Sequence, residues 1–481
     1  MNTLDRNTRL ILEGSIIKAL LAISWPVVLG NLLHISYQLI DFFWVGRLGS
    51  AALASVSVSF PILFLMLGTG FGLSIAGSVF IAHYAGARRQ QEVNHASAQT
   101  LILMLALALV SSVIGYVVSP WILGLMGLEP QVYDGAMVYL RVSFIGLVFT
   151  FGFLVYQSIL RGVGEVRFPL WVICGTVVGN AILDPILIFG WGPIPALGIL
   201  GAALATIITQ AVAAAIGLHA LFTGRYGIHI RRQDLVPDLD FLRETVRVGL
   251  PASIEQATRP LGALALLFLT ATFGTLSVAA FGIGTRILGF VFIPALGLAM
   301  ATTTLVGQNI GAGNIRRAED AARLSAWAAF WGLNAVALLT WIGAAPLVRL
   351  FAPGDPALTA MTAEFVRILS LSYAAIGVQQ TLLGAFRGAG GTVPAMLIGL
   401  MSQWVLQVPI TWYLCMHTVL GVKGVWWGFP AANLIATLVT IAWFRYGAWQ
   451  DLKLMERGLP PKAAHKPDLV DEAAGEQEYI S

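Results

Sequence analysis

Long apolar stretches recur along the whole chain and are separated by short polar connections. Each is at least about 20 residues long, which is the length that a helix needs to cross the hydrocarbon core of a bilayer. We count twelve, at residues 16–45, 52–82, 95–118, 137–160, 168–190, 198–222, 244–272, 278–306, 318–342, 362–386, 394–416 and 424–448. They are too long and too uniformly apolar for the strands of a β-barrel. The pattern therefore predicts an all-α integral membrane protein with twelve transmembrane helices, each satisfying its own backbone groups.

The pattern also repeats within the chain. Residues 26–62 align without a gap on residues 251–287 at an offset of 225, so that Pro26 falls on Pro251. Further matches follow in the same order at nearly the same offset, pairing 83–89 with 308–314, 160–164 with 386–390, and 197–203 with 420–426. Each copy contains six predicted spans. Because six is even, both copies enter the membrane from the same side, which predicts two pseudo-symmetric lobes related as parallel repeats.

The distribution of lysine and arginine over the loops predicts how these lobes are oriented in the membrane. When the loops are assigned alternately to two sides, 21 of the 28 Lys and Arg fall on one side, Arg161 and Arg387 among them. The positive-inside rule places that side, with both termini, in the cytoplasm. The resulting division is a cytoplasmic N-terminus at 1–15, an N-lobe at 16–222, a cytoplasmic inter-lobe loop at 223–243, a C-lobe at 244–448 and a cytoplasmic tail at 449–481, which we expect to be disordered.

The composition excludes several classes of function. Only 11% of the residues are charged, against about 25% in soluble domains, and the net charge of +4 follows from topology rather than from nucleic-acid binding. No GK[ST] phosphate loop, HExxH motif or Gly-x-Ser-x-Gly elbow occurs. Cys174 and Cys415 both fall within predicted spans, so no disulfide framework is expected. These observations argue against an ATP-driven protein and against an enzyme.

Three acidic residues lie well inside apolar stretches, namely Asp41, Asp184 and Glu255. A charge at the centre of a bilayer costs about 2.5 to 3.5 kcal/mol on insertion scales. Burial favours the neutral, protonated form of a carboxyl group, so such an acid can take up and release a proton and thereby couple a proton gradient to movement. The alternative is a structural acid that is permanently protonated or paired.

Spacing gives two of these acids polar neighbours. Tyr37 precedes Asp41 by four positions, and Asn180 precedes Asp184 by four, so each pair shares a helix face. Thr206, in the sixth span, can add another oxygen. If the first and fifth helices pack together, these groups form an oxygen-rich cluster suited to a proton or to a hard cation such as Na⁺. Spacing alone leaves open whether they meet.

The third acid has a different neighbour. Arg259 follows Glu255 by four positions, so an internal ion pair is expected and favours a structural role. Pro26 and Pro251 occupy equivalent positions of the repeat and interrupt the hydrogen bonds of their helices. A bend near Pro26 that responds to the state of Asp41 is a predicted coupling element, with a plain packing kink as the alternative.

Short motifs in a fixed order resemble the multidrug and toxic compound extrusion (MATE) transporters. They are Pro26, the DFFWVGRLG of 41–49, the AGA of 85–87, the RGVG of 161–164, the NAILDP of 180–185 and the GILGA of 198–202. The resemblance covers roughly residues 15 to 450. It is closest to the bacterial branch typified by the DNA-damage-inducible protein F, in which the first-helix aspartate is present.

The resemblance implies two six-helix lobes that face each other across a cavity and export amphipathic, often cationic compounds. It assigns ion coupling to Asp41, Asn180, Asp184 and Thr206. Supporting or cavity-lining residues are Tyr37, Pro26, Tyr139 and Gln157, and secondary candidates are Glu255 and Arg259. In the sodium-coupled branch a seventh-helix glutamate pairs with a tenth-helix aspartate. The tenth helix here reads GVQQT at 377–381 and has no acid, which argues against a sodium site in the C-lobe.

We therefore expect a proton-coupled drug exporter that works by alternating access in a bacterial cytoplasmic (inner) membrane. Its partners are amphipathic drugs or toxic compounds and membrane lipid, without nucleic acid; we expect a monomer with no cofactor beyond H⁺ or Na⁺ as coupling ion. Sodium coupling and a lipid-linked oligosaccharide flippase of the wider superfamily are the alternatives. An intramembrane enzyme or a receptor fits less well. At the repeat offset Asp41 falls on Leu266, Asp184 on Pro409 and Glu255 on Gly30, so the N-lobe is expected to sense the ion.

Overall fold

The chain folds into helices throughout the part that the computed structural model describes, residues 3–351 and 354–447. The N-terminal half comprises α1 (Thr3–Glu13), α2 (Ile16–Gly46), α3 (Ser50–Gly86), α4 (Gln90–Leu125), α5 (Pro130–Gly162), α6 (Arg167–Phe189) and α7 (Ile199–Phe222). The C-terminal half comprises η1 (Arg232–Leu235), α8 (Leu239–Ala271), α9 (Thr275–Gly311), α10 (Ile315–Ile342), α11 (Ala344–Phe351), α12 (Pro356–Ser370), α13 (Tyr373–Gly388), α14 (Thr392–Leu400), η2 (Met401–Gln407), α15 (Val408–Met416) and α16 (Val422–Tyr446). The predicted tail at 449–481 lies outside the described residues.

Each predicted span coincides with a helix or with a broken helix. Among the described residues, ten helices are long and apolar enough to cross a membrane, counting Thr392–Met416 as one, and the bent pair α12 and α13 makes another. The remaining predicted span is α8, which carries Glu255 and Arg259. The prediction of twelve transmembrane helices is confirmed. Two spans are less regular than expected, because α12 and α13 meet at a bend of 47° and α14 continues into a π-helical turn at Met401–Gln407.

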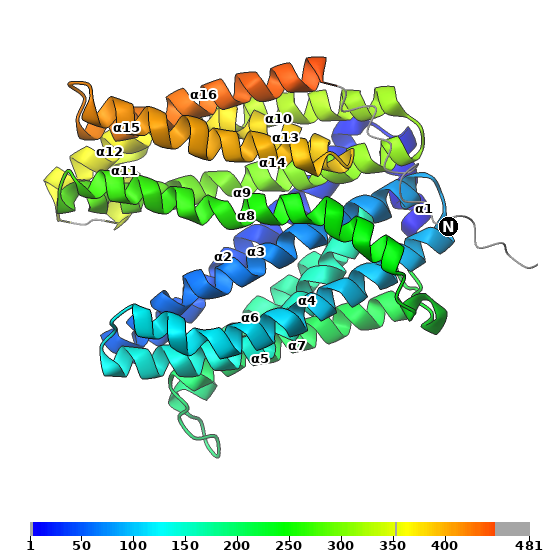
Figure 1. Cartoon of the computed structure of the whole chain (residues 1–481), viewed down its shortest axis with the longest axis horizontal. Helices are drawn as coiled ribbons and strands as arrows, with labels where there is room; N and C mark the ends of the chain where they lie inside the picture. Colours follow the sequence, from blue (N-terminus) through cyan, green and yellow to red (C-terminus); the bar gives the residue numbers. More distant parts are fainter. Residues whose placement is uncertain (1–2, 352–353, 448–481) are drawn as a thin grey trace, which may run out of the picture.

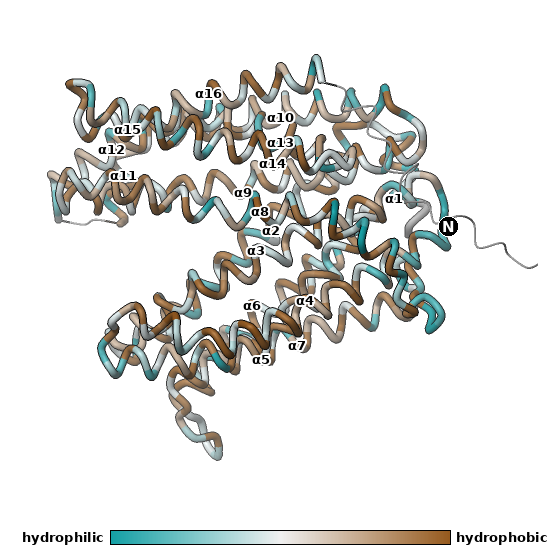
Figure 2. Tube along the Cα trace, in the orientation of Figure 1, coloured by the Kyte–Doolittle hydropathy of each residue, from teal (hydrophilic) through white to brown (hydrophobic). Residues whose placement is uncertain are grey.

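The two halves form separate bundles of helices. Figure 1 shows α2–α7 in one bundle and α8–α16 in the other; they lie close together at the end of the molecule that carries α1 and diverge toward the opposite end. In Figure 2, hydrophobic residues run along the helices, and hydrophilic residues gather near the α1 end. Large apolar side chains such as Val117 (68% exposed), Trp171 (74%) and Trp331 (65%) face outward. Apolar side chains exposed in this way are favourable in contact with lipid tails and unfavourable in contact with water.

Close packing and hydrogen bonds join the lobes near the α1 end. The ring of His83 on α3 bonds the carbonyl oxygen of Gly388 through Nε2 at 2.7 Å, and Gln308 on α9 donates to the carbonyl of Gly162 at 2.9 Å. Helices α3 and α9 approach so closely that a Cβ on Gly86 would lie 1.9 Å from the carbonyl oxygen of Gln308. Glycine permits this backbone approach, as small residues do at membrane helix interfaces. The described conformation is therefore closed at the α1 end.

Helix α1 was not expected, because residues 1–15 read as a polar cytoplasmic segment. Ile11 is only 2% exposed and belongs to an apolar cluster shared with α2 and α9. Arg317 of α10 donates to the carbonyl oxygens of Ile11, at 3.1 and 3.0 Å, and of Gly14. On the other lobe, Asn7 donates to the carbonyl of Gly164 at 3.3 Å. The N-terminal segment thus forms a helix that contacts both lobes where they meet.

Candidate functional site

The structure brings the four predicted ion-coupling residues together inside the N-lobe. Asp41 comes from α2, Asn180 and Asp184 from α6, and Thr206 from α7. Thr206 donates its hydroxyl to Oδ2 of Asp41 at 3.4 Å, and Asn180 donates Nδ2 to Oδ1 of Asp184 at 3.0 Å. The two carboxyl groups also contact each other. Asp184 and Asn180 are fully buried and Asp41 is 8% exposed, so the cluster sits in a largely water-free interior.

Several oxygens of this cluster have no hydrogen-bond donor. Among the described residues, Oδ1 of Asp41, Oδ2 of Asp184 and Oδ1 of Asn180 are buried without a partner. Within the described ranges, no lysine, arginine or histidine contributes to the interactions of the two carboxyl groups. Two adjacent carboxylates repel each other, and buried acceptors without donors are costly. The arrangement is suited to hold a positive species between these oxygens, either one shared proton or a small hard cation.

Two tyrosines flank the acids. The hydroxyl of Tyr37, on α2, lies 3.2 Å from Oγ1 of Thr209. Tyr37 is 6% exposed and Tyr139, on α5, is 5% exposed; both lie within electrostatic range of Asp41 and Asp184. Tyr37 is therefore close to Asp41, as its spacing predicted, although its hydrogen bond is to Thr209.

A narrow cavity adjoins Tyr37 and contains polar residues that the sequence reasoning missed. It is lined by His34, Tyr37, Phe153, Ile173, Thr176, Val177 and Gln210. The rings of His34 and Tyr37 stack with their centroids 6.2 Å apart, and Gln210 accepts a hydrogen bond from Thr150. His34 precedes Asp41 by seven positions, two helical turns, which was an available signal that it shares the face of the acid.

Two other predicted supporting residues lie away from the acids. Pro26 is buried within α2, which continues as a helix on both sides of it. The turn around Pro26 packs against the other lobe, since a Cβ on Gly297 of α9 would lie 2.3 Å from Val28. Gln157 donates to the carbonyl of Phe153 within its own helix at 3.0 Å. Roles for Pro26 in coupling and for Gln157 in the substrate cavity remain predictions.

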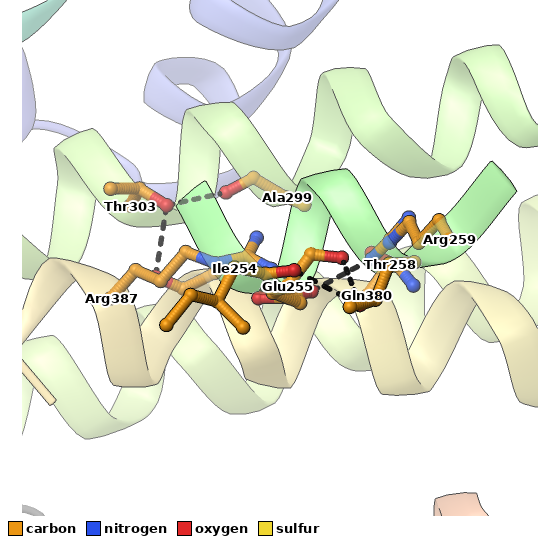
Figure 3. A network of polar contacts seen from close by, with 9 residues as sticks. Ile254, Glu255, Thr258, Arg259, Ala299, Thr303, Gln380 and Arg387 are labelled. Atoms are coloured by element: carbon orange, nitrogen blue, oxygen red, sulfur yellow. Dashed lines mark hydrogen bonds and ion pairs between the residues drawn. The ribbon is translucent and has the colours of Figure 1, made fainter. Parts of the chain in front are cut away.

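The C-lobe contains a second buried charged cluster (Figure 3). Glu255 on α8 is 2% exposed and pairs with Nη2 of Arg259 at 2.9 Å, which confirms the ion pair expected from the spacing. It also accepts two hydrogen bonds, at 2.6 and 2.7 Å, from Nη2 of Arg387 on α13. The second contact of Arg259 Nη2 is Oε1 of Gln380 at 3.3 Å.

Arg387 was expected in a connection just beyond the predicted span at 362–386, and this was wrong; its placement on the cytoplasmic side stays a prediction. The structure places it in the last turn of α13 with 6% of its surface exposed, because its side chain is directed into the lobe and bonds both carboxylate oxygens of Glu255. The oxygens that a sodium ion would need are therefore engaged by guanidinium groups. Among the described residues, no three His, Cys, Asp or Glu side chains come together as a possible metal site.

Comparisons with known proteins agree with this architecture. The MatE family model matches residues 26–186 and 251–413, one segment in each half of the chain. The probable multidrug resistance protein YpnP of Bacillus subtilis is 29% identical over 446 residues, which cover 92% of this chain and 98% of that protein.

Solved structures are similar over nearly the same length. A crystal structure of MATE in complex with MaL6 superposes with a TM-score of 0.86 at 27% identity, covering 92% of this chain and 98% of the other. A multidrug resistance MATE family transporter of the MOP superfamily in an outward-facing conformation gives a TM-score of 0.83 at 28% identity, with 90% and 96% covered.

Proposed function

This chain belongs to the MatE family of membrane transporters, and from that premise we propose that it is a secondary active multidrug exporter driven by protons. Its substrates are amphipathic, often cationic compounds, which leave the cell in exchange for the ion. Asp41 and Asp184 form the coupling site, with Asn180 and Thr206 as hydrogen-bonding partners.

One observation carries this proposal, namely a pair of contacting carboxyl groups that no Lys, Arg or His side chain of the described residues neutralises. When both groups are ionised, Asp41 Oδ1 and Asp184 Oδ2 have no donor, and the lobe attracts a positive charge. One proton shared between them satisfies both oxygens and removes the repulsion. The proton and a cationic substrate therefore compete for the same negative charge. Such competition is what the exchange of a proton for a substrate requires.

Coupling also requires that the two protonation states favour different conformations of the lobes, since a ligand that binds two states equally shifts nothing. In the described conformation the lobes are joined at the α1 end by His83 and Gln308. If α1 faces the cytoplasm, as the distribution of Lys and Arg predicts, this conformation is closed to the cytoplasm. Protons then enter from the opposite side, protonate the pair and release the substrate outward.

The remaining assignments belong to the same proposal. The chain acts as a monomer in a bacterial cytoplasmic membrane, has both termini in the cytoplasm and needs no cofactor other than the ion. We also propose that, within the family, it belongs to the branch typified by the DNA-damage-inducible protein F, because Asp41 matches the first-helix aspartate of that branch.

The experiment is drug resistance and dye export in cells that express the chain beside Asp41→Asn. We expect the variant to reach the membrane in normal amount and to lose export by at least about tenfold, because an amide cannot exchange a proton. Asp134→Asn is a matched control, since Asp134 lies exposed on α5 of the same lobe. Full export by Asp41→Asn would refute the proton role.

Sodium coupling at the same site is a second candidate, favoured by the third unpaired oxygen, Oδ1 of Asn180. A shared proton leaves that oxygen without a partner, whereas a sodium ion bound by oxygens engages it together with Asp41 and Asp184. Efflux from proteoliposomes under an imposed proton gradient, and then under a sodium gradient, separates the two. Export driven by sodium alone would replace the proton in this proposal.

A further inference from the structure

Helix α1 (Thr3–Glu13) contacts both lobes at the end of the molecule where they lie close together (Figure 1). We propose that α1 is a strap that holds this end closed, so that the lobes separate there only after α1 has left one of them. This inference rests on the proposed export function, because alternating access requires this end to open. It assigns part of the closure to a segment that precedes the repeated six-helix units.

The other hydrogen bonds of the closure follow the repeat. His83 and Gln308 are equivalent positions of the two copies, and each bonds a carbonyl group of the opposite lobe. The two carbonyl groups, of Gly388 and Gly162, also belong to equivalent positions. Each lobe therefore contributes one matching bond to the closure.

Helix α1 departs from this symmetry. At the repeat offset, residues 3–13 fall on residues 228–238 of the connection between the lobes. That connection lies against α4, where Gln99 donates to the carbonyl groups of Asp234 at 2.9 Å and Val236 at 2.7 Å. The contact of α1 with both lobes is thus a property of the N-terminal segment alone.

The C-lobe binds the C-terminal end of α1. The last carbonyl groups of a helix have no partner within the helix, and a cation near them is favourable. Arg317 of α10 supplies both, because it donates to the carbonyl of Ile11 at 3.1 and 3.0 Å and to that of Gly14. The side chain of Ile11 packs in one apolar cluster with Ala301 and Leu305 of α9. A helix as short as α1 is not stable by itself, so it depends on these contacts.

The N-lobe binds the opposite face of α1. Asn7 donates to the carbonyl of Gly164 at 3.3 Å, and a Cβ on Gly164 would lie 3.0 Å from Cδ1 of Ile11. At the end of the helix, Glu13 accepts a hydrogen bond from Nη2 of Arg88 at 2.9 Å. Ile11 therefore contacts both lobes at once.

The backbone of Arg88 is strained. Its φ is +58°, and every other residue with a positive φ in the described part of the chain is a glycine. The equivalent position of the C-lobe is Gly313, with a φ of +76°, and glycine adopts this conformation without the steric cost that a side chain brings. The pair of Arg88 and Glu13 joins two exposed side chains, so it adds little to overall stability. An arginine at this turn is explained by its contact with α1.

A strap acts only while it is attached to both lobes. Once α1 has been released, a further change to its contacts has no effect on the separation of the lobes, so variants of the strap are not additive. The competing interpretation is that α1 stabilises one lobe and moves with it. Under that interpretation, changes to α1 alter the melting temperature and leave the distance between the lobes unaffected.

The experiment measures the distance between the lobes at the α1 end. Nitroxide labels are attached through Gln91→Cys and Asp320→Cys, at exposed positions near the starts of α4 and α10, after both native cysteines have been replaced by alanine. Double electron–electron resonance on the full-length protein in lipid nanodiscs, without substrate or ion gradient, gives the ratio of open to closed molecules.

Ile11→Asp is the variant that releases α1, because it places a carboxylate where an isoleucine is buried against both lobes. We expect it to raise the ratio of open to closed molecules by at least about tenfold, the lower limit for the burial of such a side chain. Ile11→Leu is the matched control, since it keeps the volume and the apolar surface, and the ratio should not change.

A second variant separates the strap from a general loss of stability. Arg88→Gly removes the contact with Glu13 and relieves the strained backbone, so the melting temperature should stay the same or rise. The ratio of open to closed molecules should nevertheless rise about two- to fivefold, the size of an exposed ion pair. Arg89→Ala, at the exposed neighbouring residue, is the control and should leave the ratio unchanged. In a protein that already carries Ile11→Asp, Arg88→Gly should add nothing.

Each outcome decides the matter. Unchanged distances in Ile11→Asp overturn the strap, and so does an effect of Arg88→Gly that is equally large with and without Ile11→Asp. If Ile11→Asp fails to fold, as judged by gel filtration, Arg88→Gly decides alone, and an unchanged ratio overturns the strap. Because the distances are measured without an ion gradient, a failure of proton-driven export refutes the proposed function and leaves them as an independent result.

Discussion

The two lobes share one helical scaffold but differ in their buried acids, which are not paired with cationic side chains in the N-lobe and are paired with arginines in the C-lobe. In the N-lobe, Asp41 and Asp184 contact each other, and no Lys, Arg or His side chain of the described residues neutralises them. The repeat-related positions in the C-lobe are Leu266 and Pro409. In the C-lobe, Glu255 is held by two arginines, and its repeat-related position is Gly30.

The arginines of the repeat emphasise this difference. Arg161 and Arg387 occupy equivalent positions in the matched segments 160–164 and 386–390. Arg387 has an acid to pair with, whereas the N-lobe position equivalent to Glu255 is Gly30, where a Cβ would lie 3.2 Å from Cδ1 of Ile173. An acid that lacks a cation is available for exchange, and an acid that is paired is not. The duplicated halves kept their helices, and the chemistry diverged with the side chains at three pairs of equivalent positions.

The largest effect is expected from breaking the paired cluster. Arg387→Ala leaves Glu255 with one partner and should cost about 3 to 5 kcal/mol, the usual penalty for removing one member of a buried ion pair. Arg161→Ala, its counterpart, removes no ion pair recorded among the described residues and should cost far less. Thermal and denaturant unfolding of both variants in detergent measures the contrast. If both variants lost the same free energy of unfolding, the two lobes would not differ in their dependence on the buried arginine.

A smaller effect is expected from placing an N-lobe acid in the C-lobe. Leu266 is 2% exposed within an apolar cluster, so Leu266→Asp should destabilise the protein by about 2.5 to 3.5 kcal/mol, the insertion cost of an aspartate at a helix centre. Leu266→Asn is the control for the change of shape without an ionisable group. Unfolding and membrane yield are compared, and a fully stable Leu266→Asp would contradict the view that acids need the N-lobe setting.

The smallest effect on stability should come from Asp184→Asn. No cation is stranded by this change, and repulsion with Asp41 is relieved, so the free energy of unfolding should change by less than about 1 kcal/mol. The same variant should lose dye export, as Asp41→Asn does. Thermal melting and export assays on one preparation test both parts. A loss of stability as large as that of Arg387→Ala would mean that the acids are structural.

Much of the architecture follows from local properties of the sequence. The twelve spans are readable because a bilayer demands about 20 apolar residues in each helix. The Asn180–Asp184 hydrogen bond and the Glu255–Arg259 ion pair were predictable, since residues four apart share a helix face. The cost of burying charge in an apolar stretch was enough to single out Asp41, Asp184 and Glu255.

Tertiary structure decided the contacts between distant residues. Thr206 and Asp41 are 165 positions apart, and Arg387 and Glu255 are 132 apart, so no helical period relates them. The burial of Arg387 was missed because its place near a span end is the same whether its side chain turns outward or inward. Helix α1 was missed because its short segment is buried only by contact with both lobes at once.

The sequence by itself therefore determined which helices form and which acids are costly to bury. Both depend on the free energy of transferring one segment of the chain from water into the bilayer, and that is a local property. Which oxygens remain without a donor, and which arginine neutralises which acid, was decided by the packing of helices from distant parts of the chain. That packing distinguishes the exchangeable pair of the N-lobe from the paired glutamate of the C-lobe.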